Sequence, residues 1–340
     1  MIRLGPDRVT PALVRALRLG AVVARAETAL IDLVGPGAVT CFQGLLTNDV
    51  EKVGDGGFVY GALLTPKGMI VVDGWAARLG PRVSYAVPFA GRERVTEIFS
   101  RSIPPRLARM EDRTATTATL RVAGPRALAV AELAALPVPP SSGRVIEAKV
   151  GEAPCEIARA GELAPFALQI VTVPEAVDAI AGRLARSGAT PGDSTALELA
   201  RILAGWPALD ADVDDKTIPQ EVRFDEIGGV SYTKGCYTGQ ETVSRLHFRG
   251  HPNRHLRGLL FDSEPPHPPA EGWSAVTSED RDVGRVTSLA WLAEGTGGGG
   301  RWIGLGIIRR EVEPGTTVRA AGRDARVVDL PFSLPHITPA

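Results

Sequence analysis

Apolar and polar positions in the first third of the chain alternate in a way that predicts β-strands and two helices. The run TALIDLV at residues 28–34 reads as a strand, and residues 38–46 place apolar side chains at helical spacing after a Gly-Pro-Gly turn. Three consecutive strands joined by tight turns are predicted at residues 57–64, 70–77 and 83–88. A helix is predicted at residues 91–102, where Pro104 and Pro105 stop it. This order of elements predicts an α+β lobe.

The same pattern repeats in outline beyond residue 116. Residues 117–124 read as a strand that leads through a Gly-Pro pair into a helix at residues 125–136, much as the strand at 28–34 does. Further strands are predicted near Val145 and Cys155 and at residues 166–173, followed by a helix at 174–187. We therefore expect two related α+β lobes.

Two more helices carry capping signals. Thr10 and Pro11 open an amphipathic helix that runs to about Leu19, with Thr10 as its cap and proline at its first position. Asp193 caps a helix predicted at residues 194–203, and Gly205 ends it.

The last part of the chain has the pattern of a small β-barrel. Short strands separated by Pro- and Gly-rich turns are predicted at residues 256–261, 284–291, 302–308, 317–319 and 325–330. The expected domains are a first α+β lobe made of residues 1–115 and 192–250, a second α+β lobe at 116–191, and the C-terminal β-barrel at 251–335.

Length and composition limit the class of protein. The 340 residues exceed the roughly 250–300 residues at which single cores stop growing, which agrees with several domains. Hydrophobic residues make up 44% and charged residues 23%, and no apolar run approaches the roughly 20 residues of a membrane-spanning helix. A net charge of -1 provides no basic field for a phosphate backbone or an anionic bilayer. We expect no nucleic-acid partner and no membrane partner.

The cysteines and histidines give no metal site. The three cysteines lie far apart, without zinc spacing or a disulfide framework: Cys41, Cys155 and Cys236. This usage fits a reducing, cytoplasmic compartment. Three histidines recur every fourth residue near position 250, but Gly250 and Pro252 would break a helix that aligned them, so this segment is read as a polar loop and no metal is assigned.

The densest cluster of chemically special residues is GGVSYTKGCYTGQE at residues 228–241. Gly235 permits close approach beside Cys236, and the cation of Lys234 would lower the thiol pKa from its ordinary value of about 8.5. Cys236 and Lys234 are therefore the candidate catalytic residues. The alternative is a small buried cysteine in a glycine-rich hairpin, and the crowded polar surroundings favour the reactive thiol.

The segment KGCYTGQE at residues 234–241 resembles the signature of the YgfZ branch of the folate-binding, aminomethyltransferase-like (GcvT-like) proteins. Other blocks resemble the same branch: FQGLLTNDV at 42–50, LLTPKGMIVVD at 63–73, RILAGWP at 201–207, IPQE at 218–221, and GRVTS at 284–288 with IGLGIIR at 303–309. The resemblance covers about residues 28–330 and leaves out the N-terminal helix.

This resemblance implies an α+β protein with the three-lobed aminomethyltransferase-like (GcvT) folate-binding fold, in which two α+β lobes and a C-terminal β-barrel surround a channel for a tetrahydrofolate or a one-carbon derivative. It further implies a role in the assembly or repair of iron-sulfur enzymes. Iron-sulfur client or assembly proteins are then the expected partners beside folate.

The chemistry of a reduced pterin suggests which residues bind it. Its N–H, NH2 and C=O edge needs a carboxylate or an amide, and its flat ring needs apolar walls. Polar candidates in the matching blocks, at predicted element ends, are Gln43, Asn48, Asp73 and Glu221, and their relative importance stays open. The candidates for walls are Phe42, Tyr60, Met69 and Tyr237. Gln240 adds an amide, and Arg245 is the first choice for the carboxylates of the folate tail.

Two departures separate this chain from the true aminomethyltransferases. Those proteins usually carry an acid in the RLEAG turn and an acidic pair in the first-lobe strand, whereas this chain has Leu203 and Val72 at these places. We expect a pterin affinity or pose that differs from theirs. A folate-dependent aminomethyltransferase or other one-carbon transferase remains one alternative function, and a non-catalytic scaffold for cluster-assembly partners is another.

Overall fold

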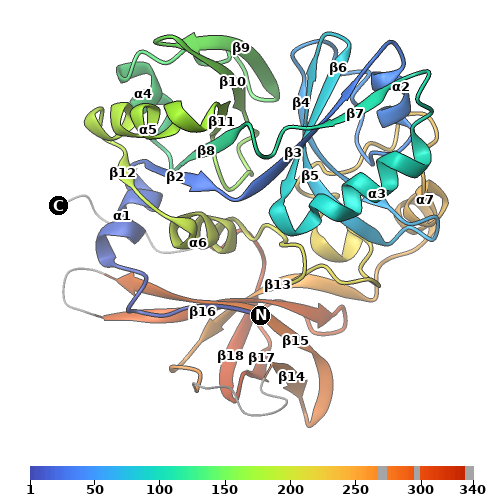
Figure 1. Cartoon of the computed structure of the whole chain (residues 1–340). Helices are drawn as coiled ribbons and strands as arrows, with labels where there is room; N and C mark the ends of the chain where they lie inside the picture. The colour runs from blue at the N-terminus through green and yellow to red at the C-terminus, as the bar shows by residue number, and fades with distance from the viewer. Residues whose placement is uncertain (267–273, 295–298, 334–340) are drawn as a thin grey trace.

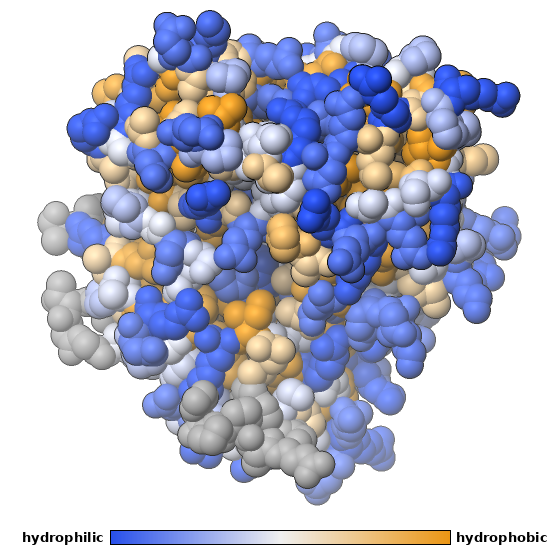
Figure 2. Space-filling model, viewed as in Figure 1, coloured by the Kyte–Doolittle hydropathy of each residue, from blue (hydrophilic) through white to orange (hydrophobic). Residues whose placement is uncertain are grey.

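Three β-sheets organise the part of the chain that the structure, a computed structural model, describes: residues 1–266, 274–294 and 299–333. In Figure 1 two α+β lobes lie side by side above a β-barrel, with α6 (Ser194–Ala204) running between them and the barrel. Figure 2 shows small groups of hydrophobic residues scattered among hydrophilic ones on the face in view. No helix within these described residues is long and apolar enough to cross a membrane.

The first α+β lobe is built on the predicted meander. Its antiparallel sheet has the order β4 (Phe58–Leu64), β5 (Ile70–Leu79), β6 (Arg82–Pro88), β3 (Thr28–Val34) and β7 (Arg109–Asp112). The apolar faces of α2 (Ala38–Gln43) and α3 (Arg92–Ser102) contribute Phe42 and Phe99, which pack against each other in the core of this lobe. The predicted strands and helices are confirmed here, and β7 is an addition.

The second α+β lobe has the sheet order β12 (Thr190–Pro191), β2 (Val22–Ala26), β8 (Ala118–Ala123), β11 (Leu168–Thr172), β10 (Ala153–Arg159) and β9 (Arg144–Val150). Helices α4 (Ala127–Leu133) and α5 (Val177–Arg186) contribute their buried faces to its core. The predicted strands and helices of this lobe are confirmed, whereas β2 and β12 were not predicted.

The C-terminal sheet closes into a barrel. Its strands follow the order β15 (Arg281–Glu294), β14 (Ala275–Ser278), β17 (Thr317–Ala320), β18 (Arg323–Val328), β13 (Arg254–Phe261) and β16 (Gly299–Arg309), and β16 pairs back with β15. This confirms the predicted barrel and adds β14. The predicted end of this domain at residue 335 lies outside the described residues.

The capping signals are confirmed. Thr10 Oγ1 accepts the Leu13 N–H at 3.2 Å at the start of α1 (Pro11–Leu19), and Asp193 Oδ1 accepts from Thr195 N at 2.9 Å at the start of α6. The remaining helical segments are α7 (Gln240–Arg249) and three 3-10 turns: η1 (Phe89–Gly91), η2 (Pro174–Ala176) and η3 (Pro219–Val222). The prediction of a loop near position 250 is wrong as far as Arg249, where α7 ends.

The first 26 residues contribute one strand to the barrel and one to the sheet of the second lobe, and none to the sheet of the first lobe. Strand β1 (Ile2–Leu4) pairs in parallel with β15 of the barrel, and β2 pairs with β8 of the second lobe. The chain enters the first lobe only at β3, so sheet membership differs from the predicted range 1–115 at β1 and β2. Local hydrophobic patterns predict a strand without specifying its partner, which explains the difference.

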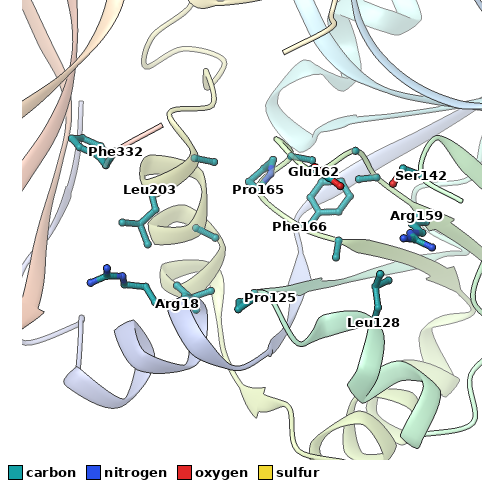
Figure 3. Close-up of a pocket in the computed structure, with 18 residues that line it drawn as sticks. Arg18, Pro125, Leu128, Ser142, Arg159, Glu162, Pro165, Phe166, Leu203 and Phe332 are labelled. Atoms are coloured by element: carbon teal, nitrogen blue, oxygen red, sulfur yellow. The ribbon is translucent and has the colours of Figure 1, made fainter. Parts of the chain in front are cut away.

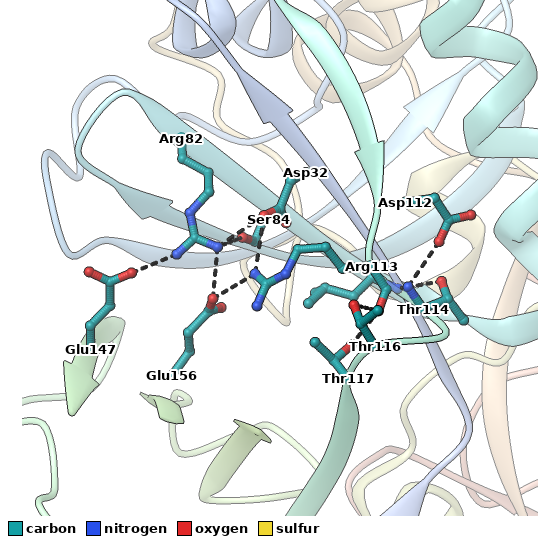
Figure 4. Close-up of polar contacts among 11 residues, drawn as sticks. Asp32, Arg82, Ser84, Asp112, Arg113, Thr114, Thr116, Thr117, Glu147 and Glu156 are labelled. Atoms are coloured by element: carbon teal, nitrogen blue, oxygen red, sulfur yellow. Dashed lines mark hydrogen bonds and ion pairs between the residues drawn. The ribbon is translucent and has the colours of Figure 1, made fainter. Parts of the chain in front are cut away.

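An ion-pair network joins the two α+β lobes (Figure 4). Arg82 Nη1 on β6 lies 2.9 Å from Asp32 Oδ2 of its own lobe and 2.7 Å from Glu156 Oε1 of the second lobe. Arg113 Nη1 contacts the same two carboxylates, and Arg82 Nη2 reaches Glu147 at 2.7 Å. Asp32 is fully buried, so this network fixes the lobes against each other through charges that need both partners.

Candidate functional site

A cavity of about 250 Å³ lies where the two α+β lobes meet α6; we call it the interlobe cavity. Successive side chains of a strand point to opposite faces, so Asp73 and Trp75 share one face of β5. Tyr60 of β4 is the cross-strand neighbour of Trp75. All three line the cavity, together with residues of β2, β3, β6, β8 and α6, the Pro165–Phe166 pair and the segment after α6.

Aromatic rings make the walls of this cavity flat and apolar. Trp75 and Trp206 stack with ring centroids 5.6 Å apart and planes inclined by 13°. Tyr60 meets Trp206 edge-on at 4.6 Å, and Phe166 of the second lobe meets Trp75 edge-on at 5.1 Å. Such packing holds the rings in fixed positions around the open space.

Asp73 is the buried carboxylate of the interlobe cavity, with 5% of its surface exposed. Tyr60 donates its hydroxyl to Asp73 Oδ2 at 2.7 Å, whereas Asp73 Oδ1 is buried and has no hydrogen-bond partner among the described residues. Burial raises the pKa of Asp73 to about 6, although the Tyr60 hydrogen bond and the charge of Arg121 act in the opposite direction. Asp73 was proposed as a residue at an element end and instead lies within β5, as the predicted strand at 70–77 already implies.

Lys234 has a different surrounding from the predicted one. Its ammonium is buried and donates to the carbonyl oxygens of Gln43 at 2.7 Å, Leu46 at 2.6 Å and Asn48 at 2.8 Å. All three donors of the ammonium are thereby used on the loop after α2. Burial lowers the pKa of Lys234 to about 8. The ammonium therefore holds this loop in place, and the activation of Cys236 by Lys234 stays a prediction.

Gln43 and Asn48 also use their side chains to hold that loop. Gln43 Nε2 donates to Asp49 Oδ1 at 2.9 Å, and its Oε1 accepts from Val50 N at 2.9 Å. Asn48 Nδ2 donates to the carbonyl oxygens of Tyr60 and Gly228, both at 2.7 Å. Neither residue is among the described residues that line the interlobe cavity.

The other predicted ligand-binding residues lie around η3 and α7. Glu221 on η3 is buried and forms a two-pronged ion pair with Arg254 at 2.9 and 3.0 Å. Tyr237 is buried, its hydroxyl lacks a partner within the described chain, and burial raises its pKa. Gln240 begins α7 and is half-buried, and Arg245 is exposed on the same helix.

The structure therefore does not bring the predicted site residues together. Of the described residues that line the interlobe cavity, Asp73 is the one predicted polar ligand and Tyr60 the one predicted wall. No residue of the segment 234–241 lines it. Cys236 is exposed on that segment, whereas Cys41 is half-buried and Cys155 is buried. The described residues contain no group of three or more side chains placed to hold a metal ion.

Sequence reasoning missed several residues of the cavity. Trp206 lies in the block 201–207, whereas Trp75 lies two residues beyond the block 63–73. The signal that could have found Trp75 is its position two residues after Asp73 on the same strand face. Arg121 and Phe166 come from the second lobe, and no local pattern indicates that they face Asp73.

A second cavity, of about 530 Å³, lies on the other side of Phe166; we call it the lateral cavity. Pro165 and Phe166 line both cavities. Figure 3 shows Leu203 on α6 and Phe332 on one side of the lateral cavity, with Phe166 and Arg159 on the other. Its lining combines apolar side chains with a few polar ones and contains no buried carboxylate comparable to Asp73.

A family model described as the GCVT N-terminal domain matches residues 16–227. The chain belongs to this family. The crystal structure of the glycine cleavage system aminomethyltransferase T from Bartonella henselae superposes with a TM-score of 0.75 at 20% identity, covering 94% of this chain and 88% of that one. The predicted aminomethyltransferase-like fold is thus confirmed.

Curated relatives of two kinds align with this chain. An aminomethyltransferase of Rubrobacter xylanophilus is 29% identical over 308 residues, which cover 88% of this chain and 79% of that protein. The tRNA-modifying protein YgfZ of Vibrio vulnificus is 34% identical over 151 residues, covering 42% of this chain and 44% of that protein. This chain thus aligns with less than half the length of that YgfZ relative. The predicted resemblance to the YgfZ and GcvT-like proteins is confirmed.

Proposed function

We propose that the protein binds a reduced folate, a tetrahydrofolate or a one-carbon derivative, with its pterin ring in the interlobe cavity. The observation that carries the proposal is the buried Oδ1 of Asp73, which lacks a partner in the described structure while Tyr60 occupies Oδ2. An unpaired buried acceptor costs about 1–3 kcal/mol, and the N–H and NH2 groups of a pterin edge would satisfy it.

The size and walls of the cavity support a pterin ring. Pockets for drug-sized ligands measure about 300–1,000 Å³, and the interlobe cavity of about 250 Å³ suits one fused ring system rather than a whole folate. Trp75 and Trp206 offer parallel aromatic faces beside the open space. The aminobenzoyl-glutamate tail would then extend out of the cavity.

The Asp73→Asn variant tests this proposal by calorimetric titration with tetrahydrofolate. Asparagine still accepts the Tyr60 hydrogen bond but loses the carboxylate, so we expect the dissociation constant to rise about tenfold or more. The wild-type affinity should fall as pH drops below about 6, where Asp73 takes up a proton and loses its free acceptor. Ionised Asp73 is the binding form, so affinity falls up to about tenfold per pH unit.

The control is Asp215→Asn, which removes an exposed carboxylate and should leave both the affinity and its pH dependence unchanged. Wild-type protein that fails to bind tetrahydrofolate contradicts the proposal. An Asp73→Asn variant with the affinity and pH profile of the wild type assigns binding to another site.

A folate-dependent aminomethyltransferase is a second candidate function. The alignment with the Rubrobacter xylanophilus protein of that name spans most of the chain and supports it. The expected difference in pterin affinity or pose from the two missing acids carries little weight against this function, because neither Val72 nor Leu203 is among the described residues that line the interlobe cavity. Val72 lies in the core of the first lobe, and Leu203 lines the lateral cavity. Turnover of a methylene donor with tetrahydrofolate would distinguish this function from binding alone.

We further propose that Cys236 serves in the support of iron-sulfur enzymes. The thiol lies on an exposed turn outside the interlobe cavity, where a protein client can reach it. The YgfZ relatives are named for tRNA modification, so iron-sulfur enzymes of tRNA modification are the clients to test first. Cys236→Ser should abolish this support in cells while preserving stability and folate affinity. If the protein is instead a non-catalytic scaffold, it should bind its client protein even when the interlobe cavity is blocked.

Native alkylation tests whether Cys236 is accessible. We expect iodoacetamide to label Cys236 before Cys41 and Cys155, because these are half-buried and buried. Peptide mass spectrometry after timed quenching measures the order. If Cys236 is labelled only when the protein unfolds, it is a packing residue, and its proposed role is lost.

A further inference from the structure

Arg121 is one of several charged residues that line the interlobe cavity, and it belongs to the second lobe. It lies on β8 directly opposite Gln169 of β11. Its Nε and Nη2 donate to Gln169 Oε1 at 3.3 and 3.1 Å, and the guanidinium lies 4.4 Å from the ring centroid of Phe166. The amide and the ring hold the guanidinium in one orientation.

No carboxylate in the described chain lies within ion-pair distance of Arg121. Its hydrogen-bond partner Gln169 is neutral and buried. Burial lowers the pKa of Arg121 to about 10. The negative charge of Asp73 is the largest effect that raises this pKa. The guanidinium remains a cation at neutral pH, and its Nη1 donates no hydrogen bond within the described residues.

Arg201, another arginine of the same cavity, shows what a fully partnered guanidinium looks like here. It donates to Glu198, to Asp212 Oδ2 at 2.9 Å and to the Trp206 carbonyl oxygen at 2.6 Å. Arg121 has no such set of partners. The buried Asp73 carboxylate with its free acceptor is costly unless another group completes it. The half-buried guanidinium of Arg121 in the same cavity keeps Nη1 free to bind that group.

We propose that Arg121 binds a carbonyl oxygen of the ligand ring while Asp73 binds its N–H edge, so that the ligand bridges the two lobes. This inference rests on the proposed function and names the part of the pterin that the cavity selects. A ring with amino and N–H donors next to a carbonyl, as in a 2-amino-4-oxopteridine, matches a carboxylate on one side and a guanidinium on the other.

The arrangement makes Arg121 a specificity-determining residue. A 4-amino group in place of the 4-oxo group would present an N–H donor to a guanidinium that also only donates. Such a mismatch leaves both groups unpaired, which a site built on hydrogen bonds rejects strongly. The exchange also removes the N3–H donor that faces Asp73, so the ratio of the two dissociation constants, 4-amino over 4-oxo, contains both contacts. The change in this ratio when Arg121 is replaced reports on the contact with Arg121.

The test uses tetrahydrofolate and tetrahydroaminopterin, which differ in the C4 substituent and in the hydrogen on N3 that goes with it, titrated anaerobically into the full chain. Arg121→Met should weaken tetrahydrofolate binding about tenfold or more and lower the 4-amino to 4-oxo ratio by a similar factor. Arg121→Lys, which keeps a donor and the charge, should retain part of the preference. Arg126→Met removes an exposed arginine outside both cavities and serves as the matched control.

The outcomes separate the two proposals. Wild-type protein that binds neither compound removes the proposed function and this inference with it. Wild-type protein that binds tetrahydrofolate, together with an unchanged ratio in Arg121→Met, overturns this inference alone. If Arg121→Met does not fold, Arg121→Gln removes the charge but keeps a polar group, and the same change in ratio is required of it.

Discussion

Replacing Arg201 by methionine is expected to lower the free energy of unfolding by about 3–5 kcal/mol, the usual effect of removing one partner from a buried ion pair. Arg201 on α6 pairs with Asp212, which is fully buried, at 2.9 Å, and its Nη2 donates to Ser288 Oγ of the barrel at 2.6 Å. Methionine preserves the volume but leaves the Asp212 carboxylate without its cation. The contact between α6 and the barrel weakens at the same time.

Urea or guanidinium unfolding at pH 7 measures this effect. The matched control is Arg101→Met, because Arg101 is exposed and pairs with the exposed Glu97 on the same helix. Such surface pairs contribute about 0–1 kcal/mol, so the control should stay within that range. If Arg201→Met is no less stable than the control, the buried network does not hold α6 to the barrel.

The secondary structure was predictable for most elements that bury one face, although the buried strand β2 was missed. Strand β5 and helix α3 follow the hydrophobic period, and Thr10 and Asp193 mark helix starts by their hydrogen-bonding chemistry. Helix α7 shows the limit of this reasoning. Val243 is its one buried residue, so its sequence carries no apolar stripe, and a glycine-rich segment precedes it.

The site was less predictable than the fold, because a motif marks residues that matter without indicating what they contact. Lys234, Gln43 and Glu221 satisfy buried backbone or charged groups and hold loops in place. Asp73 alone among the predicted polar ligands keeps a free buried atom at the interlobe cavity. Arg121 reaches that cavity from the other lobe, which depends on tertiary packing that no local pattern contains.

Residues 234–241 and the block 42–50 are the motifs that the sequence marks most strongly, and both support the cavity without lining it. The segment 234–241 packs on the loop after α2 through Lys234 and through the Thr238 N–H, which donates to the Gly44 carbonyl oxygen at 3.1 Å. That loop in turn leads into β4, whose Tyr60 holds Asp73. Residues 234–241 therefore support the interlobe cavity indirectly, through the loop after α2 and through β4. Cys236 on the same segment is exposed.

Replacing Lys234 by methionine should separate this supporting role from any chemistry of Cys236. The backbone carbonyl oxygens of Gln43, Leu46 and Asn48 lie 2.6 to 2.8 Å from the ammonium, and each would lose its charged donor. An unsatisfied buried acceptor costs about 1–3 kcal/mol, so we expect unfolding free energy to fall by about 3 kcal/mol or more.

The loss in Lys234→Met should appear in chemical denaturation and as faster amide hydrogen exchange in the loop after α2, since the ammonium ties that loop to the signature segment. Lys67→Met, at an exposed position of the turn between β4 and β5, removes the same charge and should change stability by less than about 0.5 kcal/mol. Cys236 in the Lys234→Met variant should still react with iodoacetamide, because its exposure does not depend on a thiolate partner. The opposite result would be a Lys234→Met protein that is as stable as Lys67→Met but whose Cys236 is alkylated much more slowly. That result would show that Lys234 activates the thiol and does not hold the loop.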